Sequence, residues 1–372
     1  MDRDKILIGV MNCGEQLKNE QDIAALKNSG FDFAVAAADK GDLDLCEKQD
    51  FEVISTLNFP LWQGGCGENA GKYKNGSLVK KLEEGNKEIM EHKALSGDYI
   101  CDGIHSWDFE YLNKIMKKYA KLYPEKICFA NIGSADENYE EYVEKYVEAV
   151  ENDYICLKTS PFGENSHDYL EKLDIASAAC RRDFRDLWVI MQSERMTESQ
   201  LRLQSNVALL YGADIIIHSD LCSDLDAVSK VNGEVQSFSD TFKNFTNVCV
   251  APTGKIHAAC PEMKAQLIEQ AKRNDYFEGI ENVSSIRSNS ALLAGYFEKF
   301  NGDGSAVMLV NVTNPADPNH VAEVEIDVPQ YKLSCVFVDG TETVHLTSDR
   351  TIKVSLPTGS AAFVTVRKDR RY

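Results

Sequence analysis

Short apolar runs recur through the first 220 residues of this 372-residue chain, and longer helical patterns separate them. Eight such runs are present, at residues 5–13, 31–38, 51–59, 98–102, 127–133, 154–161, 187–194 and 213–220. They are almost continuously apolar, which is typical of parallel strands covered on both faces. Eight strands alternating with helices predict a (β/α)₈ barrel, the TIM barrel. The alternative, a doubly wound open sheet, usually carries a glycine-rich phosphate turn after its first strand, and MNCGEQ is not one.

The helical patterns between the runs support this interpretation. Residues 138–152 place their apolar side chains on one stripe, as an amphipathic helix does. At the start of residues 197–211, Thr197 and Gln200 have the spacing of a capping box. The sequence therefore predicts helices over both ranges.

The pattern changes after about residue 250. One more helix is expected at 261–274, and short alternating runs separated by turn residues follow it, as in an antiparallel sandwich. We therefore predict three parts. These are a (β/α)₈ barrel over 1–250, a linking helical segment over 251–275 and a small C-terminal β-sandwich over 276–372.

Charge and cysteine content restrict the possible partners. The formal net charge of −19 disfavours binding to nucleic acid or to anionic membranes, whereas a neutral sugar is indifferent to it. The 11 cysteines show no CxxC or Cys/His ligand spacing, so we expect buried apolar thiols, no metal and no cofactor. The N-terminus enters a strand directly, without an apolar run typical of a signal peptide, which predicts a cytoplasmic protein. The sequence carries no signal for an oligomeric state.

In a barrel of this type, the reacting groups lie at the C-terminal ends of the strands. The residues delivered there are mostly amides, carboxylates and aromatic side chains, which suit a polyhydroxylated ligand because they pair with hydroxyls and stack on sugar rings. From the third strand onward they are Asn58, Trp62, Asp102, His105, Trp107, Asn131, Lys158, Gln192, Glu194, His218 and Asp220.

Several of these residues also have a structural interpretation. Trp62 and Trp107 can pack within their own loops, and His218, after three isoleucines, can be a core histidine. Lys158 can form a structural ion pair, or it can be a Schiff-base lysine of an aldolase. The five-glycine loop at 63–77 can be a lid or a plain surface loop.

Three segments resemble retaining glycoside hydrolases of clan A, the barrel clan of β-galactosidases and agarases. They are HKALSGDYICDGIHSWDFEYLNKIMKKYAKLYPEKICFANIG (92–133), LWVIMQSERMTESQLRLQSNVALLYGADIIIHSD (187–220) and LLAGYFEKFNGDGSAVMLVNVTN (292–314). The resemblance implies hydrolysis of a glycosidic bond by two carboxylates ~5 Å apart, an acid/base after the fourth strand and a nucleophile at the end of the seventh. Glu194 occupies the position of that nucleophile.

The chain departs from the clan at the acid/base. Gly103 stands where the clan has glutamate, and its neighbour Asp102 would face the barrel interior only if a bulge turned it inward. His105 is another candidate acid. The expected functions are therefore a retaining hydrolase that uses Glu194 with Asp102, or an inactive glycosidase-like protein that binds a carbohydrate or another partner. A lyase or aldolase that uses Lys158 is a third hypothesis.

Overall fold

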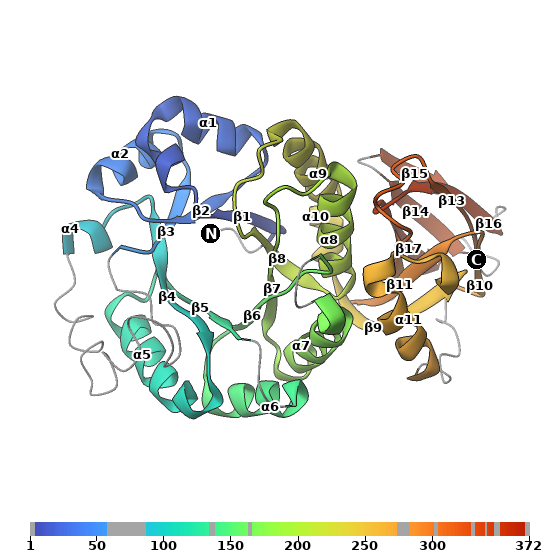
Figure 1. Ribbon diagram of the computed structural model, residues 1–372, viewed down its shortest axis with the longest axis horizontal. Helices are drawn as coiled ribbons and strands as arrows, with labels where there is room; N and C mark the ends of the chain where they lie inside the picture. Colours follow the sequence, from blue (N-terminus) through green and yellow to red (C-terminus); the bar gives the residue numbers. More distant parts are fainter. Residues whose placement is uncertain are drawn as a thin grey trace.

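The computed structural model describes residues 4–57, 87–133, 138–162, 166–273, 283–300, 304–328, 332–338, 341–345 and 350–368. Its first part is a closed ring of eight strands, all paired in parallel, and β1 pairs with β8 to complete the ring (Figure 1). The strands are β1 Leu7–Met11, β2 Phe33–Ala36, β3 Glu52–Ser55, β4 Leu95–Ile104, β5 Ile127–Ile132, β6 Tyr154–Lys158, β7 Asp186–Met191 and β8 Ala213–His218. The predicted (β/α)₈ barrel is confirmed.

Helices surround the ring on its outer side (Figure 1). They are η1 Gly14–Lys18, α1 Glu20–Asn28, α2 Lys40–Lys48, α4 Lys87–Met90, η2 Ser106–Asp108, α5 Phe109–Leu122, α6 Tyr139–Ala149, η3 Ser166–Asp168, α7 Tyr169–Asp183, α8 Glu198–Leu210, α9 Leu225–Ser237 and α10 Ser239–Phe242. α8 begins with the predicted capping box, because Thr197 Oγ1 accepts from the Gln200 amide and Gln200 Oε1 accepts from the Thr197 amide. In the described part of the chain, no helix is long and apolar enough to cross a membrane.

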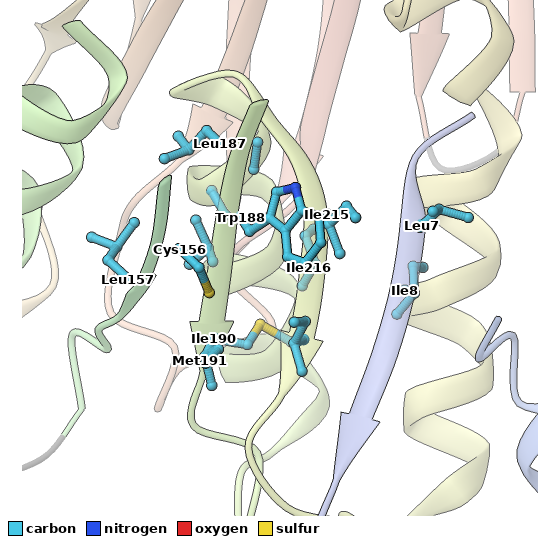
Figure 2. Packing of buried hydrophobic residues seen from close by; sticks show 14 of the residues in the cluster. Leu7, Ile8, Cys156, Leu157, Leu187, Trp188, Ile190, Met191, Ile215 and Ile216 are labelled. Atoms are coloured by element: carbon cyan, nitrogen blue, oxygen red, sulfur yellow. The ribbon is translucent and has the colours of Figure 1, made fainter. Parts of the chain in front are cut away.

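Large side chains fill the barrel near the N-terminal ends of its strands. Trp188 lies between Cys156 on β6 and Ile215 on β8 (Figure 2). Its indole stacks on the ring of Tyr154, with centroids 4.1 Å apart, and lies 5.5 Å from the ring of Phe129. This packing places Trp188 in the core of the barrel.

Two antiparallel sheets form the second part. The six-stranded sheet has the order β15-β14-β17-β12-β11-β9, and the three-stranded sheet has the order β10-β13-β16. Their strands are β9 Phe245–Gly254, β10 Ser285–Ser288, β11 Ala291–Lys299, β12 Ser305–Asn311, β13 Val321–Asp327, β14 Lys332–Val338, β15 Thr341–His345, β16 Thr351–Pro357 and β17 Ala361–Lys368. The predicted sandwich is confirmed. Its first strand begins at Phe245, so the expected boundary at residue 250 falls inside β9, and η4 Ile256–Ala258 and α11 Pro261–Arg273 follow that strand.

The central strands of the six-stranded sheet, such as β11 and β12, are buried on both faces. One face packs against the three-stranded sheet through residues such as Leu292 and Val307. The other face packs against the barrel, where Phe363 lies 5.8 Å from Phe238 and 5.5 Å from Phe242, measured between ring centroids. One apolar cluster therefore extends from the barrel to this face of the sheet, and the opposite face belongs to a second cluster inside the sandwich.

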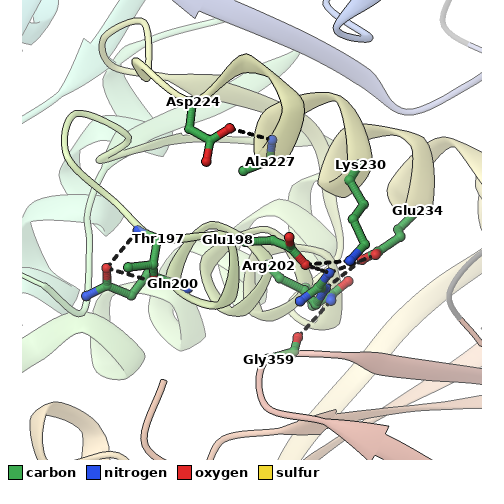
Figure 3. A network of polar contacts seen from close by, with 10 residues as sticks. Thr197, Glu198, Gln200, Arg202, Asp224, Ala227, Lys230, Glu234 and Gly359 are labelled. Atoms are coloured by element: carbon green, nitrogen blue, oxygen red, sulfur yellow. Dashed lines mark hydrogen bonds and ion pairs between the residues drawn. The ribbon is translucent and has the colours of Figure 1, made fainter. Parts of the chain in front are cut away.

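Polar contacts also join the sandwich to α8. The Gly359 carbonyl accepts a hydrogen bond from Asn206 Nδ2 at 2.9 Å (Figure 3). Gly359 has a φ of +80°, and a Cβ at this position would lie 2.7 Å from the Ser199 carbonyl oxygen and 2.9 Å from the Leu203 amide nitrogen. Only glycine fits this contact without displacing α8.

A network of ion pairs holds α8 against α9. Arg202 is buried and donates to both carboxylate oxygens of Glu234, at 2.7 and 2.9 Å, and to Glu198 at 2.5 Å (Figure 3). Lys230 Nζ also pairs with Glu198, at 2.8 Å. Each of these charges has a partner, so the network is electrically balanced.

Candidate functional site at the barrel mouth

The C-terminal ends of the strands enclose a hollow of about 470 Å³. It contains six of the residues that the sequence predicts for the site, which are Asp102, Asn131, Lys158, Gln192, Glu194 and Asp220. The other lining residues are Gly103, Ile132, Gly133, Thr159, Ser160, Phe162, Lys172, Ile190 and Ser219. These residues come from β4 to β8 and from the segments that follow those strands.

A bulge in β4 brings Asp102 to the hollow. The pairing register between β4 and β5 shifts twice, once between Tyr99 and Cys101 and again between Asp102 and Ile104. Asp102 is therefore paired with Asn131, whose Oδ1 accepts a hydrogen bond from the Tyr99 hydroxyl at 2.5 Å inside the barrel. Gly103 follows with a φ of +62°, a left-handed conformation that glycine adopts at little cost.

Tyr99 places a proton donor beside this carboxylate. Burial raises the pKa of the Tyr99 hydroxyl well above its usual value, and the nearby Asp102 carboxylate raises it further. The phenol therefore keeps its proton throughout the physiological range and can donate it in a hydrogen bond. The hydrogen bond from the Tyr99 hydroxyl fixes the Asn131 side chain, and the same hydroxyl lies next to the Asp102 carboxylate.

Glu194 follows β7 and reaches the hollow from its outer edge. Its side chain is 58% exposed, and its Oε1 lies 3.4 Å from the Nε of Arg195. Arg195 has a φ of +60°, a conformation that is strained for a residue with a side chain. Two hydrogen bonds anchor the start of this segment: Gln204 Nε2 donates to the Gln192 carbonyl at 2.9 Å, and Ser193 Oγ donates to the Asp220 carbonyl.

Asp220 is held by neutral donors. Asn12 Nδ2 donates to its Oδ1 at 2.9 Å and to the Ser219 carbonyl at 3.0 Å, and Ser219 Oγ donates to its Oδ2 at 3.0 Å. Asn12, at the end of β1, has a left-handed φ of +56°. These bonds fix the Asp220 carboxylate at the rim.

Lys172 is a lining residue that reading the strand ends did not reveal. It lies on α7, it is buried, and its Nζ is 2.9 Å from Asp168 Oδ2. The i,i+4 spacing of Asp168 and Lys172 was visible in the sequence, but that spacing is ordinary on a helix surface. Only the packing of α7 against the barrel directs this lysine toward the hollow.

His218 faces away from the hollow. It pairs with Met191 and Val10, and its ring packs edge-on against Phe31 at 5.1 Å on the helix-covered side of β8. Neither ring nitrogen makes a hydrogen bond of normal geometry within the described residues, and the side chain of Asn232 on α9 lies close to the ring. Burial lowers the pKa of His218 to about 4, so the ring is neutral at physiological pH. The geometry matches the core-histidine interpretation.

His105 and Trp107 do not line the described hollow. His105 and Trp107 form a stacked pair in the segment after β4, with ring centroids 4.3 Å apart, and Trp107 is 67% exposed. Asn58, Trp62 and the loop at 63–77 lie outside the described residues. In the parts of the chain that the structure describes, no group of three or more His, Cys, Asp or Glu side chains could hold a metal ion.

No protein family model matches the sequence, and no curated protein matches it. Among solved structures, α-galactosidase I from Mortierella vinacea is similar over 98% of this chain and 97% of its own, with a TM-score of 0.54 and 9% identity. An Anoxybacillus α-amylase matches 98% of both chains, with a TM-score of 0.45 and 12% identity. A glycoside hydrolase family 5 mannosidase from Rhizomucor miehei matches 64% of this chain and 95% of its own, with a TM-score of 0.46 and 9% identity. The galactosidase likeness extends over both the barrel and the sandwich, and at this identity it is a likeness of fold.

Proposed function

We propose that the hollow binds a saccharide and that Glu194 and Asp102 hydrolyse a glycosidic bond in it with retention of configuration. The observation that carries this proposal is that Asp102, turned inward by the β4 bulge, and Glu194, after β7, line the same hollow. These are the two strands from which clan A glycosidases, which the sequence resembles, take their carboxylates. The fold likeness to a galactosidase supports the same class of protein.

In this mechanism the Glu194 carboxylate attacks the anomeric carbon while the Asp102 carboxylic acid protonates the departing glycosidic oxygen. A glycosyl ester to Glu194 results. Asp102, now a carboxylate, then takes a proton from water, which attacks the anomeric carbon and releases Glu194. Asn131 and Gln192 are amides at the same rim and can hydrogen-bond sugar hydroxyls.

Hydrolysis of a panel of aryl glycosides with one common leaving group tests the proposal. Glu194→Gln should abolish turnover, and Asp102→Asn should lower kcat/KM by about 10²–10⁴-fold, the usual contribution of a general acid. Glu125→Gln is the matched control, because Glu125 is exposed in the turn before β5, at the opposite end of the barrel. Activity that survives Glu194→Gln would remove Glu194 from the mechanism.

A chemical rescue distinguishes the two roles. With Glu194→Ala and an activated aryl glycoside, azide should enter the space of the carboxylate and yield a glycosyl azide of inverted configuration. Asp102→Ala with azide should instead yield the retained product, because the ester to Glu194 still forms. The same anomer from both variants would contradict the assignment.

Saccharide binding without turnover is the second candidate function. Two observations favour it: the glutamate expected at the acid/base position is Gly103, and more than half of the Glu194 side chain is exposed to solvent. Calorimetric binding of an oligosaccharide that the protein does not cleave, even at high enzyme concentration, would support this candidate over hydrolysis.

A further inference from the structure

Lys158 is a charged residue of the hollow that the proposed mechanism does not use. It is the last residue of β6, and its exposed side chain lines the mouth of the barrel. The other charged lining residues are Asp102, Glu194, Asp220 and Lys172. The role of the Lys158 ammonium therefore depends on how these charges are paired.

The other charges of the hollow have partners. Asp220 accepts hydrogen bonds from Asn12 and Ser219, and Lys172 pairs with Asp168. Glu194 has the guanidinium of Arg195 beside it, and Asp102 lies next to the Tyr99 hydroxyl. Lys158 differs, because across the described ranges its ammonium group has neither an ion-pair partner nor a hydrogen-bond partner.

The neighbours of Lys158 along the rim are neutral. Asn131 precedes it on β5, and Gln192 follows it at the end of β7. Of the carboxylates, Asp102 comes from β4, two strands away, and Glu194 follows Gln192 by two residues and has the guanidinium of Arg195 beside it. An anionic group at β6 would meet the ammonium of Lys158, with the amide of Gln192 beside it as a further hydrogen-bond donor.

We infer that Lys158 binds an anionic substituent, a carboxylate or a sulfate ester, and that the saccharide of this hollow is therefore acidic. The inference rests on the proposed saccharide site and names its substrate class. The net charge of −19 repels such a ligand at long range, but that repulsion is screened beyond ~8 Å at physiological ionic strength. Within the hollow, the direct contact with the ammonium decides selectivity. The carboxylate-to-ammonium contact is the kind of charge-assisted bond that contributes most to a polar site.

Matched ligands test this inference by titration calorimetry on the whole chain. The acidic probes are uronic acid trisaccharides of several linkages and a sulfated galacto-oligosaccharide. The neutral probes are the same trisaccharides after carboxyl reduction, which keeps the linkage and removes the charge. The wild-type protein should bind at least one acidic probe about 10- to 100-fold more tightly than its neutral counterpart, as expected for a hydrogen bond to a charged group.

Lys158→Met should remove that preference, whereas Lys158→Arg should retain most of it. Lys121→Met, at an exposed position at the end of α5, is the control and should change neither Kd. Binding of the acidic probe should weaken as NaCl rises from 50 to 500 mM in the wild type, but not in Lys158→Met.

Three outcomes would overturn the inference: equal affinity of the wild type for acidic and neutral probes, unchanged affinity in Lys158→Met, or no binding of any probe. Tight acidic binding without cleavage would support the inference and contradict hydrolysis. Cleavage of neutral glycosides with no acidic preference would support hydrolysis and contradict the inference. A preference confined to the sulfated probe, and lost in Lys158→Met, would support it with sulfate as the bound group.

Discussion

Gly359→Ala tests whether the sandwich presses directly on α8. Gly359 has a φ of +80°, and a left-handed backbone costs an alanine about 1–2 kcal/mol. The new methyl group would also lie 2.7 Å from the Ser199 carbonyl oxygen and 2.9 Å from the Leu203 nitrogen. These are rigid backbone atoms, and overpacking of this kind costs about 1–3 kcal/mol. The free energy of unfolding should therefore fall by about 2–5 kcal/mol.

The expected change in melting temperature follows from chain length. An unfolding entropy of about 2.1 cal/mol/K per residue gives about 0.8 kcal/mol/K for 372 residues, so Tm should fall by about 3–6 °C. Gly233→Ala is the matched control, because Gly233 lies in the middle of α9 and an added Cβ would meet nothing within 4 Å. Alanine is favoured over glycine in a helix by about 0.8–1 kcal/mol, so this variant should melt about 1 °C higher.

Differential scanning calorimetry on the wild type and both variants measures the three values under one condition. The decisive quantity is the difference in Tm between the two alanine variants, which should be about 4–7 °C. Gly359→Ala should melt below the wild type and Gly233→Ala above it. A Gly359→Ala protein that melts within 1 °C of the wild type would refute the contact between this turn and α8. The same result would remove the steric reason for glycine at this position.

Two further predictions concern buried polar groups. Arg202→Met should lower the free energy of urea unfolding by about 3–5 kcal/mol, because it leaves the carboxylate of Glu234, only 15% exposed, without a cation. The double change Arg202→Met with Glu234→Leu should recover part of this loss, and a double variant less stable than the single one would contradict the reasoning. His218 has a pKa of about 4 in the folded protein and 6.5 when unfolded, so the unfolded chain takes up the proton first as pH falls. The contribution of the neutral His218 ring to stability is complete above pH 6.5, and about 3 kcal/mol of it is lost as pH falls toward 4. Between pH 7 and 4, the free energy of unfolding of the wild type should therefore fall by about 3 kcal/mol more than that of His218→Leu. Equal losses in the two proteins would show that His218 does not titrate as its burial implies.

The strands of the barrel could be predicted from the sequence because burial on both faces makes each one a compact apolar run. The run at 213–220, for example, contains β8, Ala213–His218. β9 was not predicted, because FTNVCVAPTG mixes polar residues and a proline with apolar ones. That strand lies at the edge of its sheet, where one side needs no hydrogen-bonded neighbour and proline is tolerated.

The site was predictable in type but not in detail. Strand ends in a barrel must meet at one rim, and this rule was enough to bring Asn131, Gln192 and Asp220 together. The inward turn of Asp102 depends on a bulge whose only sequence signal is Gly103 with its left-handed backbone. The side of β8 on which His218 lies depends on pairing register, which a continuous apolar run does not reveal.

The burial of α8 has a consequence for synthesis of the chain. Ser199, Arg202 and Leu203 on this helix are all buried, and the turn at Gly359 that contacts the helix is made some 150 residues after it. All eight barrel strands therefore leave the ribosome well before the segment around Gly359, which covers α8, has been synthesised. Until β17 emerges, the apolar flank of the nascent barrel faces water or a chaperone, and a transcript truncated after α10 would encode an aggregation-prone product.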